Sequence, residues 1–176
     1  LKKGAPTYRA TLNLNGGGPL ARYYVSVSYV DEGGMYKVDE GLKDYNTNAN
    51  YRRWNYRLNV DMDITKSTLL KVGVAGSLDK KNEPGMAGNI WASAMRNNPI
   101  SVPVMYANGY VPAYGSENDQ LNPWVAATQT GYQETWNNKL QANATLEQSL
   151  NFITKGLKFI GRYGFDTNNY QWINRK

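Results

Sequence analysis

Carboxylate side chains that could act as an acid–base pair occur close together at two places in the chain. Asp61 and Asp63 are two residues apart, and Asp31 and Glu32 are adjacent. Acid–base catalysis requires two carboxyl groups held at a set separation across a pocket, whereas these pairs lie side by side on one segment. The chain contains no cysteine and no histidine, which removes thiol catalysis and most zinc sites. We therefore expect no catalytic residue, no metal and no cofactor, and a protein that is not an enzyme.

Aromatic and asparagine side chains gather in a long segment rich in Pro and Gly, about residues 82–133. Aromatic rings can stack on sugars or pack against peptides, and the amides of asparagine can form hydrogen bonds to either. The alternative is that the same side chains fold the segment on itself or dock against a partner protein. The candidate ligand-binding residues are Trp91, Tyr106, Asn108, Tyr110, Tyr114 and Trp124.

The charges are dispersed along the whole chain. There are 20 Lys and Arg residues against 14 Asp and Glu residues, which gives a formal net charge of +6. The basic residues stand singly and form no block, which favours a solvated surface over a nucleic-acid interface. We therefore expect no nucleic-acid partner.

The elements that must position these side chains are long amphipathic strands. From Trp54 to Ile64 apolar and polar residues alternate for eleven residues. Alternation with a period of two places the two kinds on opposite faces of a strand. A tilted strand needs roughly 9–11 residues to cross a bilayer, which is longer than most half-buried strands of soluble proteins. Similar patterns predict five further strands, at about residues 8–15, 21–30, 68–80, 135–150 and 157–166.

The predicted connections alternate in length. Short turns lie near residues 16–19, 65–67 and 151–156, and long connections cover 31–50 and 82–133, the latter with a short helix near 86–96. Short turns on one side and long loops on the other are typical of outer-membrane barrels. The aromatic residues expected at the long-loop ends of the strands, as an interfacial girdle, are Tyr29, Trp54, Tyr56, Trp136, Tyr163 and Phe165.

The parity of the turn near residues 65–67 makes a sharper prediction. The apolar residues of the strands before and after it share a face only if the turn has an odd residue count. One allowed register places Asp61 opposite Lys71 on the polar face, and we expect a cross-strand ion pair there. In a wet lumen such a pair contributes only about 0.2–1 kcal/mol.

The number of strands predicts that they belong to something larger. About eight strands are needed to close a barrel, and an open sheet in a bilayer would leave two unpaired edges. The sequence begins at Leu1 without a signal peptide, and we expect a mature or internal segment: one partial barrel domain over residues 1–176. The residues expected to line its lumen are Arg57, Asn59, Asp61, Lys71, Lys139 and Arg162.

Several runs of this chain resemble the SusC/RagA-type TonB-dependent transporters of Bacteroidetes. The runs span nearly the whole chain in the order of that family. They are ARYYVSVSY at 21–29, DEGGM at 31–35, NYRRWNYRLNVD at 50–61, NPI at 98–100 with Pro103, NG at 108–109, NPW at 122–124 and ITKGLKF at 153–159.

The resemblance implies a multi-pass β-barrel of about 22 strands in the cell outer membrane, closed by an N-terminal plug that this chain lacks. Such a transporter imports nutrient oligomers, either oligosaccharides or oligopeptides. Its partners would be a SusD-like surface lipoprotein over the barrel and TonB, which acts through parts absent from this chain. The alternative from another class is a soluble or surface-attached glycan-binding β-sandwich, which predicts strands of five to seven residues packed against a second sheet.

Overall fold

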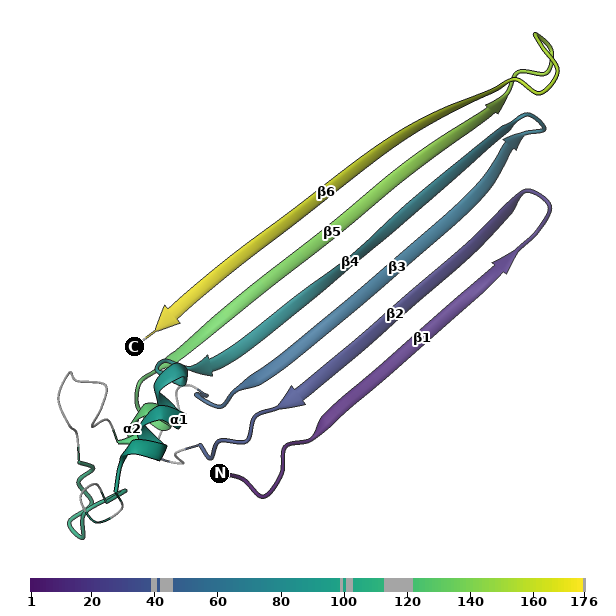
Figure 1. Cartoon of the computed structure of the whole chain (residues 1–176). Helices are drawn as coiled ribbons and strands as arrows, with labels where there is room; N and C mark the ends of the chain where they lie inside the picture. The colour runs from purple at the N-terminus through teal and green to yellow at the C-terminus, as the bar shows by residue number, and fades with distance from the viewer. Residues whose placement is uncertain (39–40, 42–45, 99, 101–102, 113–121, 176) are drawn as a thin grey trace.

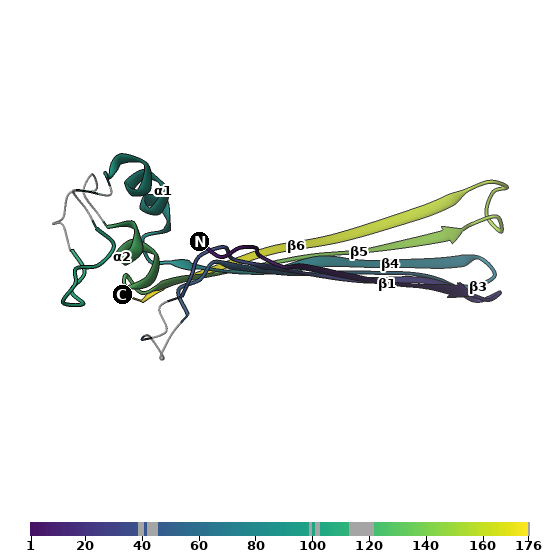
Figure 2. The same cartoon turned by 90° about the horizontal axis from the view of Figure 1, so that it is seen from below.

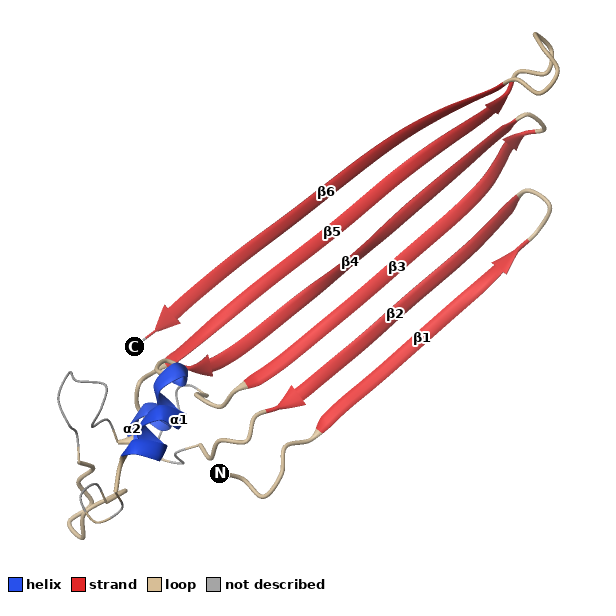
Figure 3. Cartoon of the chain, viewed as in Figure 1, coloured by secondary structure: helices blue, strands red, loops and turns tan. Residues whose placement is uncertain are grey.

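The computed structural model describes residues 1–38, 41, 46–98, 100, 103–112 and 122–175. Within these residues the chain is all-β, with a single six-stranded antiparallel sheet in which each strand pairs with the next along the sequence (Figures 1 and 3). The strands are β1 (Thr7–Gly17), β2 (Ala21–Gly33), β3 (Asn50–Thr65), β4 (Thr68–Pro84), β5 (Tyr132–Ser149) and β6 (Lys158–Arg175). Two helices, α1 (Ala87–Arg96) and α2 (Pro123–Thr128), follow β4.

The register of the strand pairs places most of the apolar residues on one face of the sheet. Directly opposed residues of an antiparallel pair share a face, so the pairing of Leu12 with Val27, and of Val27 with Tyr56, aligns three strands. The apolar face comprises Tyr8, Ala10, Leu12 and Leu14 of β1; Tyr23, Val25, Val27 and Tyr29 of β2; Trp54, Tyr56, Leu58, Val60 and Met62 of β3; Leu70, Val72, Val74 and Leu78 of β4; Leu140, Ala142, Ala144 and Leu146 of β5; and Phe159, Tyr163 and Phe165 of β6.

The apolar face is covered by no other element of the described chain. Each residue of the face is exposed or half-exposed, and Leu12 and Tyr163 keep 61% and 71% of their surface accessible. Figure 2 shows the sheet as a single layer. In the described residues the buried apolar cluster consists of Ile90, Ala126 and Ala127, and it belongs to the helices and not to the sheet.

The described parts of the long connections and both helices lie at one end of the sheet, and the tight turns lie at the other (Figures 1 and 2). The connection between β2 and β3 reaches the helices, because its residue Tyr36 packs against their buried cluster. Asn82, at the end of β4, donates hydrogen bonds to the carbonyl oxygens of Asn46 and Asn48 at 2.9 and 3.0 Å. The predicted asymmetry of the connections is therefore present in the fold.

The predicted strands are confirmed in number and order, but β6 is much longer than the prediction. The pattern predicts a strand that ends near residue 166, whereas β6 continues to Arg175. Tyr163 and Phe165 consequently lie in the middle of β6 and not at its long-loop end. The prediction that these two aromatic residues lie at the long-loop end of their strand is therefore wrong.

The connection between β3 and β4 keeps the apolar residues of both strands on one face, as predicted, but the odd residue is not in the turn itself. The turn itself has two residues, Lys66 and Ser67, and an irregularity between Asp63 and Thr65 adds the odd residue. Asp61 and Lys71 are direct register partners, as predicted. They therefore lie on the same face of the sheet.

The helical prediction is confirmed for α1 but is incomplete. A helix over residues 86–96 places Ile90, Trp91, Ala94 and Met95 on one side, where the sequence predicts the buried face. Of these four only Ile90 is buried; Trp91 and Met95 are 57% and 86% exposed. Ser93 is buried instead, and its hydroxyl donates to the carbonyl oxygen of Asn89. The second helix, α2, was not predicted, although Asn122 before Pro123 is a helix-start signal.

Candidate functional site

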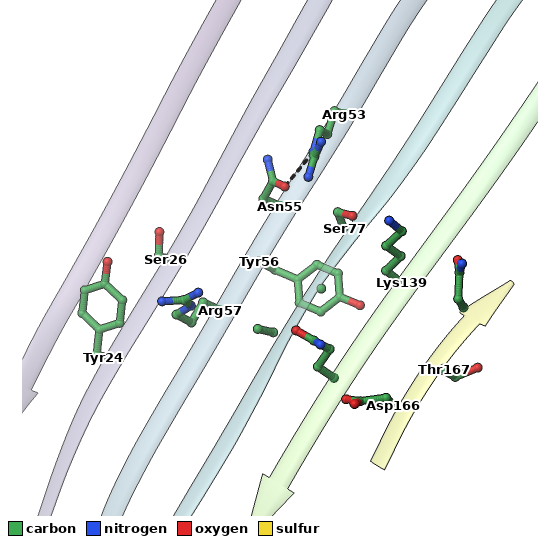
Figure 4. A pocket seen from close by; sticks show the side chains of 14 residues that line it. Tyr24, Ser26, Arg53, Asn55, Tyr56, Arg57, Ser77, Lys139, Asp166 and Thr167 are labelled. Carbon is green, nitrogen blue, oxygen red and sulfur yellow. Dashed lines mark hydrogen bonds between the residues drawn. The ribbon is translucent and has the colours of Figure 1, made fainter. Parts of the chain in front are cut away.

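A trough lies on the polar face of the sheet, in the described part of the chain. It forms because β4 presents the small side chains of Ala75 and Ser77 on this face, between strands with long side chains, and its volume is ≈ 660 Å³. Its side chains come from β2, β3, β4, β5 and β6, and Figure 4 shows them around the trough. Its lining consists of Tyr24, Ser26, Arg53, Asn55, Tyr56, Arg57, Ala75, Gly76, Ser77, Lys139, Gln141, Asp166, Thr167 and Asn168.

The trough contains more positive than negative charge. Arg53 is engaged, since its Nε lies 3.4 Å from Asp79 and donates to Asn55 at 2.8 Å. Among the described residues, neither Arg57 nor Lys139 has a carboxylate within ion-pair distance. Hydroxyl and amide groups surround these two cations, so the trough offers donors to carboxylates, hydroxyls or carbonyl groups of an occupant.

The remaining residues predicted to line a lumen share this polar face but lie nearer the tight turns. Lys71 and Arg162 border a smaller hollow of ≈ 400 Å³ that contains neither Arg57 nor Lys139. Asn59 lies opposite Gly73, and Asp61 lies opposite Lys71. The six predicted residues therefore share a face without forming one site.

The predicted ion pair between Asp61 and Lys71 is wrong. The Nζ of Lys71 donates to Glu147 on β5 at 2.6 Å, and its pairing in the described chain is with that residue. Glu147 is the partner of Leu69, one position diagonal to Lys71. A long lysine side chain can reach a diagonal neighbour, so direct opposition alone does not determine the pair.

The aromatic residues of the long connection do not form one ligand site either. Trp91 and Trp124 line an apolar pocket of ≈ 270 Å³ together with Tyr36 and Ile90 (full lining Leu1, Tyr36, Lys37, Ile90, Trp91, Ala94, Val104, Pro123, Trp124 and Ala127). Among the described residues, the buried indole nitrogen of Trp124 has no hydrogen-bond partner. A pocket of this composition can accept an apolar or aromatic group.

The other candidate ligand residues lie outside that pocket. Tyr106 and Tyr110 close a turn in which the Tyr106 amide donates to the Tyr110 carbonyl oxygen at 2.8 Å, and the side chain of Asn108 accepts from the Tyr110 amide at 3.1 Å. Asn108 thus stabilises the turn, while Tyr110 is exposed. Tyr114 lies outside the described residues.

A polar cluster at the loop end of β2 and β3 was not predicted. The carboxylate of Asp31 accepts hydrogen bonds from Asn50 at 2.9 Å, Tyr29 at 3.0 Å and Arg52 at 3.2 Å. These bonds, that from Asn50 foremost, hold the pKa of Asp31 below its ordinary value. The sequence does contain a signal for this cluster. On the apolar face, Asp31 follows Tyr29 and Arg52 precedes Trp54, so apolar residues give way to charged ones at this point on both strands.

The described residues contain no group of three or more His, Cys, Asp or Glu side chains that could hold a metal ion. Among them there is also no helix long and apolar enough to cross a membrane. No protein-family model matches this sequence. No curated protein matches it at significant similarity. The class that the fold defines is an all-β chain with a single, unclosed antiparallel sheet.

Proposed function

We propose that this chain is part of the barrel wall of a SusC/RagA-type transporter, which imports oligosaccharides or oligopeptides across the outer membrane. One observation carries the proposal: strands of 11–18 residues present a continuous apolar face that no described element covers. In water, exposed apolar surface of this extent is unfavourable, because each Å² removed from water contributes roughly 25 cal/mol. Lipid would remove the whole face from water.

The two open edges support a larger barrel. β1 and β6 each have a neighbour on one side only, and β6 is 18 residues long. Unpaired backbone groups in a bilayer cost several kcal/mol each, so both edges require further strands. The family resemblance implies about 22 strands in all.

The end that carries the long connections is proposed as the extracellular end. Outer-membrane barrels have short periplasmic turns and longer extracellular loops. The helices and the apolar pocket beside Trp91 and Trp124 would then meet either the cargo or a SusD-like lipoprotein. TonB would act through a plug that is not among these residues.

The polar face would line the lumen. Its trough places Arg57 and Lys139 among hydroxyl and amide groups, which suits contact with a plug or with polar cargo during passage. Neither role requires chemistry on the substrate.

The electrophoretic mobility of the native protein from outer membranes, with and without boiling, tests the proposal. We expect a band that shifts on heating, has a mass several times 19.8 kDa, and co-purifies with a lipoprotein. A water-soluble species near 19.8 kDa with unchanged mobility would refute the barrel. The glycan-binding sandwich would then need reconsideration, although the described chain lacks the second sheet that it requires.

A further inference from the structure

Two aromatic side chains of β6 lie exposed on the polar face of the sheet, beside the trough. Tyr170 and Trp172 are two residues apart, and each keeps more than half of its surface accessible. Their register partners on β5 are Asn137 and Thr135, which alternate at a period of two with Lys139 of the trough. The two rings and the trough therefore belong to the same face.

Neither ring is engaged by another part of the described chain. Two other tyrosines of this face have partners: the Tyr51 hydroxyl donates to Asp79 at 3.0 Å, and the Tyr24 hydroxyl donates to Asn13 at 3.4 Å. Among the described residues, Tyr170 and Trp172 make no hydrogen bond, ring contact or cation–π contact. Both rings are open to an occupant of the face.

The trough and the two rings form one continuous path along β6. Asp166 and Asn168 line the trough, and Tyr170 follows Asn168 on the same face at a distance of about 7 Å along the strand. From Asp166 to Trp172 the strand spans about 20 Å. A surface of this length suits an oligomer rather than a single small molecule.

The charge of the trough favours an anionic occupant. Its lining has the cations of Arg53, Arg57 and Lys139 against one carboxylate, that of Asp166. Arg53 is already paired with Asp79. Arg57 and Lys139 project from the strands on either side of β4 and have no carboxylate partner among the described residues (Figure 4). Positive charge in a hollow raises the local concentration of anions.

From this arrangement we propose that the trough, together with Tyr170 and Trp172, binds an acidic oligosaccharide, a glycan whose sugar units carry carboxylate groups. A sugar ring presents C–H groups on its faces and hydroxyl groups on its rim. The flat aromatic rings match the faces, and the amides and hydroxyls of the trough, which both donate and accept, match the rim. The inference rests on the proposed function and names the class and charge of its cargo.

An acidic oligopeptide matches this surface less well. Its carboxylates would suit Arg57 and Lys139, but extended peptides are recognised through pockets for alternate side chains or through an open strand edge. No aliphatic side chain larger than that of Ala75 lines the described trough, so it offers no pocket for an apolar side chain. The trough also lies in the middle of the sheet and not at its edge.

The experiment measures glycan binding by the native protein purified from outer membranes in detergent. The probes are acidic tetrasaccharides from pectin, alginate and hyaluronan, the neutral maltotetraose, and the peptide tetraglutamate, each titrated by calorimetry. We expect at least one acidic tetrasaccharide to bind about tenfold more tightly than maltotetraose, because a hydrogen bond to a charged group is worth about that factor. The heat-dependent band shift of the same preparation reports on the barrel independently of binding.

The charge variants assign the effect to the trough. Lys139→Gln and Arg57→Gln should each weaken binding of the acidic tetrasaccharide about tenfold and leave that of maltotetraose unchanged. Asp166→Asn should strengthen it, since it removes the carboxylate of the lining. Lys66→Gln, which removes the same charge in the tight turn after β3, is the matched control and should have no effect.

A ring variant separates stacking from charge. Trp172→Ala should weaken binding by a factor that is the same at low and high salt, whereas the effect of Lys139→Gln should shrink as salt screens the charge. Tighter binding of tetraglutamate than of every acidic sugar, unaffected by Trp172→Ala, would identify an acidic peptide as the occupant and overturn the proposal.

Two further results would also overturn it: equal affinity for the acidic and neutral tetrasaccharides, or unchanged affinity in both Lys139→Gln and Arg57→Gln. If the band of that preparation still shifts on heating, the proposed function stands without this cargo. A water-soluble species with unchanged mobility would refute the proposed function itself, whatever glycan it binds.

Discussion

Asp31 stands at the residue where the apolar run of β2 gives way to charge. Its carboxylate accepts three hydrogen bonds, and these keep its pKa below the ordinary value of 3.8. A carboxyl group whose pKa is lowered by folding stabilises the native state above its unfolded pKa. That contribution is lost as the pH falls through the lower, folded value.

We therefore expect Asp31→Asn to lower the stability at pH 7 and to weaken the loss of stability on the acid side of pH 3.8. Urea unfolding followed by tryptophan fluorescence across the pH range measures both effects. Asp63→Asn, at the other end of the sheet and in no described ion pair, is the control. A parallel acid profile for Asp31→Asn and the wild type would contradict the role of the cluster.

Gly76 is required by the close approach of two neighbours. It lies opposite Tyr56, and a Cβ at this position would overlap the Tyr56 ring and the carbonyl oxygen of Lys139. Gly76→Val should cost about 1–3 kcal/mol of unfolding free energy, as other overpacked sites do. Gly164→Val is the matched control, because a Cβ there meets nothing within 4 Å. Equal midpoints of urea unfolding for the two variants would show that the contact with Tyr56 is not needed.

At the scale of the strand, the free-energy cost of introducing a charged side chain depends on which face of the sheet it occupies and how deep in the membrane it lies. Val60 lies on the apolar face of β3, whereas its neighbour Asn59 points to the polar face. Val60→Arg should destabilise the barrel by roughly 2–4 kcal/mol, and Asn59→Arg by much less. Folding titrations into lipid vesicles measure both values. Similar losses for the two variants would mean that the apolar face does not meet lipid.

The alternation of side chains was sufficient to predict six strands, because a period of two survives wherever one face is apolar. It failed beyond residue 166, since Tyr170 and Trp172 fall on the polar face while Asn169 and Gln171 fall on the other. The last residues of β6 are extended because they pair with β5. This pairing joins two segments of the chain, so the local residue pattern does not predict it. The partner of Lys71 was missed for a similar reason, because a diagonal contact depends on the reach of the side chain.

The site was less predictable than the fold. Residues of the polar face follow directly from strand parity, but the trough depends on two small side chains of β4, Ala75 and Ser77, that lie between longer neighbours. The pocket beside Trp91 and Trp124 depends on how two helices and the chain near Tyr36 pack together. Packing between distant segments is not encoded in the spacing of aromatic residues.

At the scale of the whole molecule, the sheet has an apolar face and two open edges. Within the described residues no element covers the face and no further strand pairs with the edges. Exposed edges pair with other chains, and large apolar patches associate in water. The 176-residue chain produced alone should therefore sediment as large oligomers in buffer and need detergent to disperse.

A variant with Leu12→Lys, Val60→Lys and Tyr163→Lys should be more soluble, since the charges interrupt the apolar face on three strands. Analytical ultracentrifugation with and without detergent measures this. A monodisperse monomer of 19.8 kDa in plain buffer would mean that the face is covered within the chain, and lipid would no longer be needed to explain it.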